Sequence, residues 1–590
     1  WSAADAMSIS QIHDTIAGTT VRAWNPLFSN VSSIEDMGNH RLKFTYSSMS
    51  GSMKAGYCFQ MRPTVRDHAG MFFWKSNGVT LQDVDVHFLH GFGIVGQNSS
   101  DITLKNDLFA TPEGSGRTTV GYADFIQMSG CKGEVRVEDC TFANPHDDPI
   151  NVHGTFMQVV ERISSRQFKV RYMHNETAGF PNFFEGDEVE LMTKGNMLPV
   201  ADSTAKVTAV EGPSGDSSAS PTGNLTDIII TLDKDMPESI VANNYVVENI
   251  TYTPNVVIQN NYFKETPTRG ILVTTRKKVE IRNNIFDAMG MAAIYISDDA
   301  QSWYESGPTK DVTIENNIFR RSGIGTSTQA VILVEPTNPT VSTEQTVHEN
   351  MNITGNTFYM ADNQLLNAKS VKNLSFTNNR VYRYDPNVNI TLTVPKTVLQ
   401  LGEAVTVSAN ATGRSLSTAL YAFNGCKNVT LAGNTYDGGL KVNASISNMT
   451  SAEITKGEGE NVIVAGSTNQ LAAVGSIAYE SSDESVITVT NSGVVKASGE
   501  GTANVRAYTV VAGRKFVSDE ASFTVGSEVA ANLPKNVTVT GQKESTADIN
   551  DKITYQAAVE PSEANQEVTW SVLDPVTQAV SDHASPRRVC

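Results

Sequence analysis

The sequence predicts an all-β protein whose main domain is a right-handed parallel β-helix with an inserted β-barrel and a C-terminal β-sandwich. Three observations predict it. A phrase of alternating apolar residues followed by Asn-Asn-x-Phe recurs along most of the chain. The repeat stops over residues 156–251, where strands with their own alternation replace it. From about residue 446 the composition changes again, to short strands separated by Gly and Ser.

Each copy of the phrase predicts one strand and one corner of a coil. Alternating Val and Ile give a strand with one buried face, and Asn tolerates the left-handed backbone of a corner. The Phe then enters the interior, where its burial contributes about 1.5–3 kcal/mol. Because no coil buries its face alone, many must stack. A β-sandwich does not predict this phrase at coil-length spacing. The copies are 102–109, 135–142, 256–263, 279–286 and 312–319, and more weakly 352–358, 374–379 and 429–436.

The remaining segments set the domain boundaries. The insert begins directly after His153-Gly154, so it either walls a site near that point or merely decorates the helix. An excursion is also expected near Leu392. The predicted segments are a partial N-terminal β-barrel (1–68), β-helix (69–155), inserted β-barrel (156–251), β-helix (252–445), β-sandwich domain (446–528), and an incomplete second copy with a tail (529–590).

Composition excludes several classes of function. The chain has 590 residues, enough for several domains of about 100–200 residues each. Its net charge of −18 argues against nucleic acid, since phosphate binding needs clustered Lys and Arg. The chain contains no run of about 18 apolar residues, so the sequence predicts no membrane span. The five cysteines are scattered and show no zinc spacing. Cys131 and Cys140 could meet across a strand, but we expect buried free thiols.

The N-terminus shows no basic and apolar leader. We expect that the leader was trimmed and that the protein is secreted or displayed on a bacterial surface. The sequence leaves a homodimer open.

Two adjacent carboxylates mark the candidate site. Asp147 and Asp148 precede a short alternating strand, and aligning Gly154 with Gly130 places Asp124 opposite Asp148. The two glycines are 24 residues apart, which is typical of one solenoid coil of roughly 20 to 50 residues. If the two phrases stack, three carboxylates gather on one surface. The alternative is a turn in which Asp caps backbone amides.

Further polar residues fall near this surface. Arg269 lies opposite Asp148 in the next coil when Ile271 is set against Ile150, so it could bind substrate hydroxyls or hold a carboxylate. We also expect substrate-binding roles for residues beside the acids or at the far ends of the following strands, and for an aromatic residue that could stack on a substrate. These are His146, Asp298, Asp299, Glu335 and Trp303. His153 is expected to bond at the end of a coil.

These stretches resemble glycoside hydrolase family 110, the exo-acting α-1,3-galactosidases of blood-group-B type. The residues that carry the resemblance are 121–127, 137–142, 144–151, 268–272 and 294–299, followed by the inserted barrel. The resemblance covers roughly residues 1–440 and implies inversion of configuration, no metal or other cofactor, and Asp124, Asp147 and Asp148 as the catalytic acids. Residues 479–503 resemble bacterial immunoglobulin-like group 2 domains, which implies an immunoglobulin-like β-sandwich.

Glycoside hydrolysis needs one acid to protonate the leaving oxygen and one base to activate water. Clustered acids raise one another's pKa, which keeps one of them protonated. We expect Asp148 to donate the proton and Asp147 and Asp124 to polarise the water, although these roles could be permuted.

The predicted function is removal of terminal α-1,3-linked galactose from host glycans such as blood group B antigen or linear Galα1-3Gal. An endo-acting polygalacturonase-like hydrolase is the enzyme alternative, but few Lys or Arg crowd the Asp motif to receive uronates. A non-catalytic glycan-binding adhesin is the other alternative, because β-helices and immunoglobulin-like repeats also build surface binders.

Overall fold

The computed structural model describes residues 9–526, except 16, 24–25, 50–52, 54–55, 63–65, 67, 217–221, 326–328, 361–362, 384–388, 413–418, 437–441, 461, 465–475 and 512–513, together with residues 536–540, 555–560 and 568. The chain divides into two compact units. The first comprises residues 1–388, 413–474 and 511–513, and the second comprises 389–412, 475–510 and 514–590. No helix in the described part of the chain is long and apolar enough to cross a membrane.

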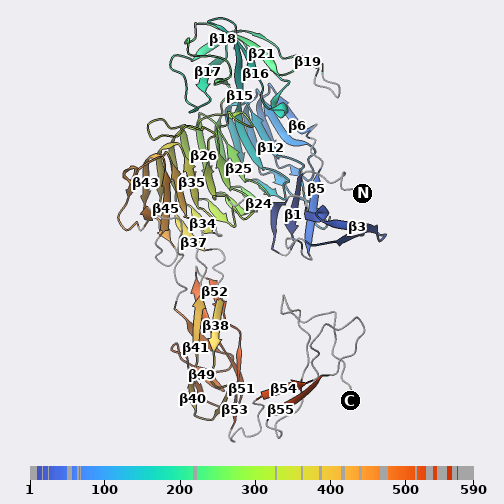
Figure 1. The fold of residues 1–590 in the computed structure, drawn as a ribbon, viewed down its shortest axis with the longest axis vertical. Coiled ribbons are helices and arrows are strands. Elements are labelled where there is room, and N and C mark those ends of the chain that lie inside the picture. The colour runs from blue at the N-terminus through green and yellow to red at the C-terminus, as the bar shows by residue number, and fades with distance from the viewer. Residues whose placement is uncertain are drawn as a thin grey trace. The chain divides into compact units, whose positions relative to one another are not determined.

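Three parallel sheets wind around a common core in the first unit and form the predicted β-helix (Figure 1). Sheet 1 contains β7 (Asn77–Gln82), β10 (Ser100–Lys105), β13 (Lys132–Glu138), β23 (Asn255–Gln259), β26 (Lys278–Arg282), β30 (Asp311–Glu315), β33 (His348–Thr354), β36 (Val371–Thr377), β43 (Lys427–Ala432) and β46 (Ile454–Lys456). Sheet 2 contains β8 (Asp85–Val86), β11 (Leu108–Phe109), β14 (Thr141–Ala143), β24 (Tyr262–Thr266), β27 (Ile285–Met289), β31 (Ile318–Arg320), β34 (Thr357–Met360), β37 (Arg380–Arg383) and β44 (Thr435–Tyr436).

Sheet 3 carries the candidate site. Its strands pair in parallel from one coil to the next. They are β6 (Ala69–Trp74), β9 (Phe92–Gln97), β12 (Ile126–Ser129), β15 (Ile150–Arg162), β25 (Ile271–Val273), β28 (Ile294–Ile296), β32 (Ile332–Val334), β35 (Leu366–Lys369), β42 (Tyr421–Asn424), β45 (Val442–Ser447) and β47 (Val462–Val464).

The phenylalanine of the repeat forms a buried column inside the helix. Neighbouring rings from successive coils stack with centroids 4.7–5.1 Å apart. Each of these side chains is at most 1% exposed, so the column confirms the predicted interior ladder. Its members are Phe109, Phe142, Phe263, Phe286, Phe319 and Phe358.

The two asparagines of the repeat perform different tasks at the corner. The first adopts a left-handed backbone, with φ of 59° at Asn260, 57° at Asn283 and 56° at Asn316, as Asn tolerates better than most residues. The second is buried in every copy but the last, and its side-chain amide donates to the Oδ1 of the corresponding residue in the next coil. This hydrogen-bonded column runs through Asn261, Asn284, Asn317, Asn356, Asn379 and Asn434.

The insert is a closed antiparallel barrel with its own hydrophobic core. Its six strands pair in the cyclic order β15, β16 (Gln167–Arg171), β21 (Asp227–Leu232), β18 (Ala205–Glu211), β17 (Glu188–Thr193), β22 (Tyr245–Asn249) and back to β15. The barrel lies at one side of the stacked coils (Figure 1). A small hairpin of β19 (Ser214–Asp216) and β20 (Thr222–Asn224) extends from it.

Strand β15 belongs to both the helix and the barrel. Residues 150–153 pair with sheet 3, and residues 156–162 pair within the barrel. Between them, Gly154 pairs antiparallel with Ser306 of the short strand β29 (Glu305–Ser306). A Cβ at Gly154 would lie 2.5 Å from Ser306 Oγ, so a larger residue at this crossing would have to displace the buried Ser306 hydroxyl. The barrel is therefore fixed to the coil that carries the Asp-Asp pair.

The N-terminal segment forms two separate sheets where a partial barrel was expected. β1 (Ile9–Asp14) pairs with β2 (Thr19–Ala23) and with β5 (Tyr57–Arg62), and β3 (Val31–Asp36) pairs with β4 (Leu42–Tyr46). A 3-10 turn, η2 (Pro26–Phe28), precedes β3. No closed barrel forms among the described residues before 69.

The β-helix extends beyond the predicted boundary at residue 445. β45, β46 and β47 each pair in parallel with an earlier coil, and η5 (Ser451–Glu453) precedes β46. The repeat in the sequence does not reveal this last coil, because its strands lack the Phe.

The second unit consists of two small sheets that share one core. One contains β39 (Val398–Gln400), β53 (Ala521–Gly526), β51 (Gly501–Val511) and β48 (Ala478–Ser481), with β52 (Arg514–Val517) beside β51; the other contains β40 (Ala404–Thr406), β50 (Val494–Ala497) and β49 (Ile487–Val489).

Residues 389–412 supply strands to this second unit, including the hairpin of β38 (Asn389–Thr393) and β41 (Ser408–Thr412). The domain predicted from residue 446 therefore also uses the excursion near Leu392. Most of residues 529–590 lie outside the described residues; β54 (Asn536–Thr540) and β55 (Gln556–Glu560) pair antiparallel there. Cys131, Cys140 and Cys426 are buried free thiols, as predicted, whereas Cys58 is free but only half-buried. Cys590 lies outside the described residues.

Candidate active site

Strand register brings the three aspartates together as predicted. β12 pairs with β15 so that Ile126 lies opposite Ile150, which aligns Asp124 with Asp148 in neighbouring coils. Ile150 in turn lies opposite Ile271, which aligns Asp148 with Arg269. Asp124, Asp147, Asp148 and Arg269 all lie just before the first residue of the strand that follows them. The sequence pattern alone thus fixed the register of this part of the site.

The outward-facing residues of sheet 3 form the floor of the site. Gln127, Asn151, Leu272 and Tyr295 lie in one row across β12, β15, β25 and β28. Their strand neighbours, the inward-facing Ile126, Ile150, Ile271 and Ile294, are fully buried in the helix core. Strand alternation therefore makes a rigid floor whose polar members face the substrate side.

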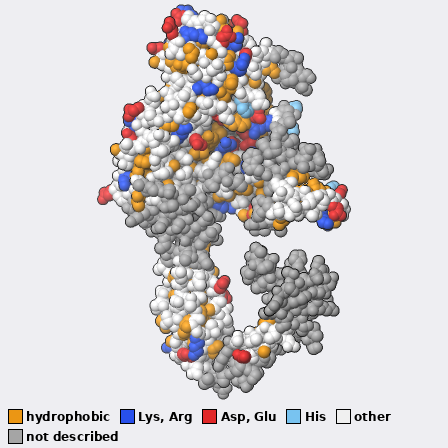
Figure 2. Space-filling view, viewed as in Figure 1, with side chains coloured by type: hydrophobic (Ala, Val, Ile, Leu, Met, Phe, Trp, Pro, Cys, Tyr) orange, Lys and Arg blue, Asp and Glu red, His pale blue; other side chains and the backbone are white. Residues whose placement is uncertain are grey.

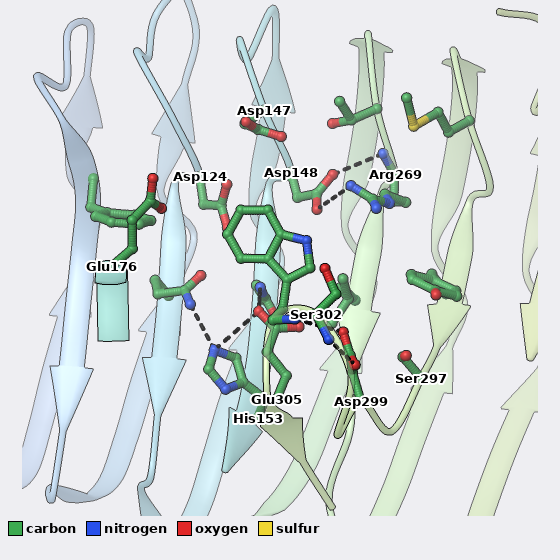
Figure 3. Close-up of a pocket in the computed structure, with 18 of the residues that line it drawn as sticks. Asp124, Asp147, Asp148, His153, Glu176, Arg269, Ser297, Asp299, Ser302 and Glu305 are labelled. Atoms are coloured by element: carbon green, nitrogen blue, oxygen red, sulfur yellow. Dashed lines mark hydrogen bonds and ion pairs between the residues drawn. The ribbon is translucent and has the colours of Figure 1, made fainter. Parts of the chain in front are cut away.

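A cavity of about 740 Å³ lies above this floor. Figure 2 shows acidic and basic side chains together in a hollow next to the barrel. The three aspartates lie at one end of the floor, and His153, Asp299 and Glu305 lie at the other (Figure 3). The lining also includes Arg22, Arg66, Phe92, Glu176, Thr177, Thr268, Arg269, Met291, Ser297, Ser302, Trp303 and Thr337.

Two arginines from the N-terminal segment bind Asp147. Arg22 Nη2 lies 2.9 Å and Arg66 Nη2 lies 2.8 Å from Asp147 Oδ2. Arg22 Nη2 also donates to the backbone carbonyl of His146 at 2.9 Å. Two charged donors on one oxygen strongly favour the carboxylate form of Asp147.

Asp148 is held from the next coil. The Arg269 backbone N–H donates to Asp148 Oδ1 at 2.9 Å, and Arg269 Nη1 donates to Oδ2 at 3.3 Å. The guanidinium also lies over the ring of Tyr295, 5.4 Å from its centroid. Burial raises the pKa of Asp148, and the Arg269 charge opposes this rise.

Asp124 has the least compensated charge of the three. Burial, together with the charges of Asp147 and Asp148, raises its pKa well above the usual range, and Arg66 only partly opposes this. No ion pair forms at Asp124 within the described residues. The cluster as a whole is therefore suited to hold a proton on Asp124 or Asp148 beside an ionised Asp147.

Carboxylate oxygens of Asp124, Asp147 and Asp148 lie within 4.8 Å of one another, and this is the one such acidic group among the described residues that could hold a metal ion. Arginines already pair with Asp147 and Asp148. This charge balance favours a shared proton over a divalent cation.

A second polar group lies across the floor from the aspartates. The His153 Nδ1 lies 2.6 Å from the Gly154 carbonyl and its Nε2 lies 2.7 Å from Gln127 Nε2. The same Nε2 lies 3.5 Å from Glu305 Oε1. Glu305 Oε1 accepts from Asn151 Nδ2 at 3.1 Å. These groups offer hydrogen bonds to a neutral polar substrate.

A short segment of the barrel closes one side of the mouth. The 3-10 turn η3 (Asn175–Thr177) brings Glu176 and Thr177 into the cavity lining. Glu176 Oε2 accepts from Arg66 Nη1 at 3.1 Å. The rings of His174 and Trp303 lie 4.3 Å apart at a tilt of 30°. The barrel is therefore a wall of the pocket.

The family model described as GLAA-B beta-barrel domain II matches residues 167–246, within the inserted barrel. A protein named alpha-1,3-galactosidase A from Peterkaempfera griseoplana is 40% identical over 533 residues, covering 90% of this chain and 72% of that protein. Alpha-1,3-galactosidase A of Streptomyces avermitilis is 44% identical over 421 residues, covering 71% of this chain and 66% of the relative.

The chain belongs to the α-1,3-galactosidase family. A relative named alpha-1,3-galactosidase B, from Bacteroides thetaiotaomicron, is 35% identical over 332 residues, covering 56% of this chain and 52% of its own length. The chain thus spans about half to three quarters of the length of these relatives. The resemblance to glycoside hydrolase family 110 is confirmed; the immunoglobulin-like resemblance stays a prediction.

Within this α-1,3-galactosidase family fold, the structure brings some of the predicted site residues to the pocket and not others. Asp124, Asp147, Asp148, Arg269, Asp299 and Trp303 line the cavity. His146 and Asp298 are buried and Glu335 is exposed, and these three lie outside the lining. Asp298 Oδ1 instead accepts from the Gly307 N–H at 3.0 Å. One coil-end position can face the pocket while its neighbour turns away, because side chains alternate.

Two of the three arginines of the α-1,3-galactosidase site, Arg22 and Arg66, were not predicted from the sequence. Few cations are expected near the Asp motif from the sequence, yet Arg22, Arg66 and Arg269 all line the cavity. Arg22 and Arg66 come from an N-terminal segment with no repeat to reveal its position. All three contact carboxylates of the protein. The argument against a uronate substrate therefore rests on these arginines being paired already, and not on a lack of cations.

Two other residues of the pocket lining, Gln127 and Asn151, could have been predicted from the sequence. Each of them is the second residue of the strand that follows an Asp motif, and this position faces outward. Glu305 and Glu176 have no such signal in the sequence, because Glu305 lies in the short strand β29 outside the repeat and Glu176 lies in the insert.

Proposed function

We propose that the protein is an exo-acting α-1,3-galactosidase that hydrolyses terminal α-1,3-linked galactose from glycans with inversion of configuration. One observation carries the proposal: three buried aspartates, two held by arginines, meet in a walled pocket of a chain that belongs to the α-1,3-galactosidase family. The barrel segment at the pocket mouth supports exo action, since a pocket receives a chain end more readily than the middle of a polysaccharide.

The chemistry follows from how the three charges are compensated. Asp147 serves as the base, because two arginines hold it as a carboxylate. It removes a proton from water as the water oxygen bonds to C1 of galactose. The C1–O bond to the leaving sugar breaks at the same time, and the leaving oxygen takes a proton from the cluster. The total number of protons in the cluster is unchanged by one turnover.

The donated proton belongs to the pair Asp124 and Asp148. The sequence expectation assigns it to Asp148, whose pKa is raised. The pKa of Asp124 is raised well above its usual range by burial and by its two acidic neighbours, and no ion pair forms at it within the described residues, which supports the other member. Galactosides with a series of aryl leaving groups decide between them. The variant that lacks the donor hydrolyses a dinitrophenyl galactoside almost normally but fails on poor leaving groups, which need protonation.

The main test is release of galactose from linear Galα1-3Gal and from the fucosylated B trisaccharide, followed by proton NMR. We expect β-galactose to appear first if the reaction inverts. Asp124→Asn, Asp147→Asn and Asp148→Asn should each lower kcat by about 10²–10⁴-fold, the usual contribution of acid–base groups. Asp311→Asn, on the exposed face of β30, is the matched control.

Absence of galactose release by the wild type, or a full rate in Asp148→Asn, contradicts the proposal. Turnover of polygalacturonate without turnover of galactosides selects the endo-acting alternative. Glycan binding that persists without any turnover selects the adhesin. We further propose that the protein acts outside the cell, where such glycans occur, which fractionation of the producing cells tests. A homodimer stays a prediction that light scattering checks.

A further inference from the structure

The loop between β28 and β29 forms one wall of the pocket and carries Trp303. It leaves sheet 3 after Ile296 and returns at Glu305, where β29 pairs with β15. The Trp303 side chain is 43% exposed and lines the cavity. Its ring lies 4.3 Å from the His174 ring of the barrel. The position of this large exposed side chain therefore also depends on how the backbone of its loop is held.

Asp299 binds the backbone of this loop directly. Its Oδ1 accepts from the N–H of Gln301 at 2.7 Å and of Ser302 at 2.9 Å. Its Oδ2 accepts from the N–H of Trp303 at 2.8 Å. The Thr337 hydroxyl adds a fourth bond, to Oδ1, at 3.2 Å. A carboxylate has about four acceptor positions in total, so Asp299 is largely committed to the protein.

The two sides of the loop are fixed in the seam between helix and barrel. Ala300 and Tyr304 are buried in a small cluster with Phe156 and Val246 of the barrel. Lys194 Nζ donates to the Tyr304 hydroxyl at 2.9 Å. These anchors leave Ser302 and Trp303 at the top of the loop, and Asp299 is the group that orders their backbone.

We propose that Asp299 is a positioning residue that fixes Trp303 at the pocket mouth, and that it does not bind the sugar itself. Trp303 then presents an aromatic face to the substrate, where stacking on the apolar face of a sugar contributes to binding. Asp299 lies in the pocket lining, but its oxygens face the loop backbone. This assignment replaces a direct substrate contact with an indirect one.

A double-mutant cycle tests the proposal. Trp303→Ala should raise KM for Galα1-3Gal about tenfold with a smaller change in kcat. Asp299→Asn leaves one acceptor oxygen in place of two, and it should also raise KM. In the Trp303→Ala background, Asp299→Asn should raise KM no further, because it acts through the missing side chain. Additive effects on KM overturn the proposal.

A second readout does not depend on activity. The emission of Trp303 is obtained as the difference between the wild type and Trp303→Phe, and we expect Asp299→Asn to change this difference spectrum. An unchanged spectrum overturns the proposal. The kinetic arm rests on the proposed galactosidase function and the spectral arm does not, so failures of the two ideas are distinguishable.

Thr337→Val keeps the proposal testable if Asp299→Asn does not fold. It removes a single bond to the same carboxylate and should change KM and Trp303 emission in the same direction to a smaller extent. Asp311→Asn is the control for both readouts, and its melting temperature, KM and emission should match the wild type.

Discussion

Charge compensation differs among the three aspartates, although they are neighbours. Asp147 has two arginines, Asp148 has one arginine and a backbone N–H, and Asp124 has no ion pair among the described residues. Arg66 contacts both Asp147 and Glu176, so one side chain joins the base to the wall of the pocket. The protonation of the site is therefore set by residues far apart in the sequence.

Arg66→Met should shift the pH dependence of activity. The Arg66 charge lowers the pKa of Asp124, so its removal raises that pKa. Whichever limb of the kcat/KM profile Asp124 sets then moves to higher pH. We also expect kcat/KM to fall by at least about tenfold, since misplaced reacting groups cost up to 10²-fold.

The matched control is Arg166→Met, which breaks an exposed ion pair with Asp235. Exposed pairs contribute about 0–1 kcal/mol, and this variant should keep the wild-type profile. A limb that moves to lower pH in Arg66→Met would contradict the assigned electrostatics.

Asp124→Asn should trade activity for stability. The pKa of Asp124 is raised in the folded protein, so the folded state holds a proton that the unfolded chain has already released. The free energy of unfolding therefore falls as pH rises from the unfolded pKa through the folded one. Asn removes this penalty, and the variant should melt above the wild type at pH 8.

The difference in melting temperature should vanish near pH 3, where Asp124 is protonated in both states. A calorimetric pH series measures it. Equal melting temperatures of the two proteins at pH 8 would show that the buried charge is compensated in the wild type.

At the scale of the element, each corner of the β-helix depends on a hydrogen-bonded column inside the coil. Asn317 Nδ2 donates to the Ile281 carbonyl at 2.9 Å, and its Oδ1 accepts from the Asn284 N–H at 2.9 Å. Asn316 is exposed and has a φ of 56°. Adjacent asparagines therefore contribute through different physics, one by satisfying buried groups and one by its backbone conformation.

Asn317→Ala should lower the free energy of unfolding of the β-helix by about 2 kcal/mol or more, because each buried group left without a partner costs about 1–3 kcal/mol. Asn316→Gly should change it by less than about 0.5 kcal/mol, as expected for an exposed site that glycine fits. Guanidinium unfolding followed by circular dichroism measures both. Equal effects of the two substitutions would contradict this division of roles.

At the scale of the whole molecule, the pocket lies entirely within the first unit, because all of its lining residues lie between Ser10 and Thr337. The core of the second unit combines Leu399 and Val407 of the excursion with Phe523 and Val525 of the C-terminal segment. The excursion thus cannot bury its apolar face without that segment.

Deleting residues 475–590 alone should therefore reduce soluble yield, since β39 and β40 lose their partner strands and become open edges. Deleting the same residues and replacing 389–412 by a short Gly-Ser linker should restore solubility and keep wild-type kcat/KM. Gel filtration and galactose release measure the two outcomes. Loss of activity in the soluble double deletion would show that the second unit takes part in catalysis.

The sequence determined the coil register, and with it the meeting of Asp124, Asp148 and Arg269, because stacking like residues is a local rule repeated in every coil. It also determined the Phe column and the Asn corner. Only the tertiary structure decided that Arg22 and Arg66 reach Asp147, that Glu176 closes the mouth and that the loop before Glu305 walls the pocket. These contacts join segments with no shared period, so their positions follow from packing across the whole fold.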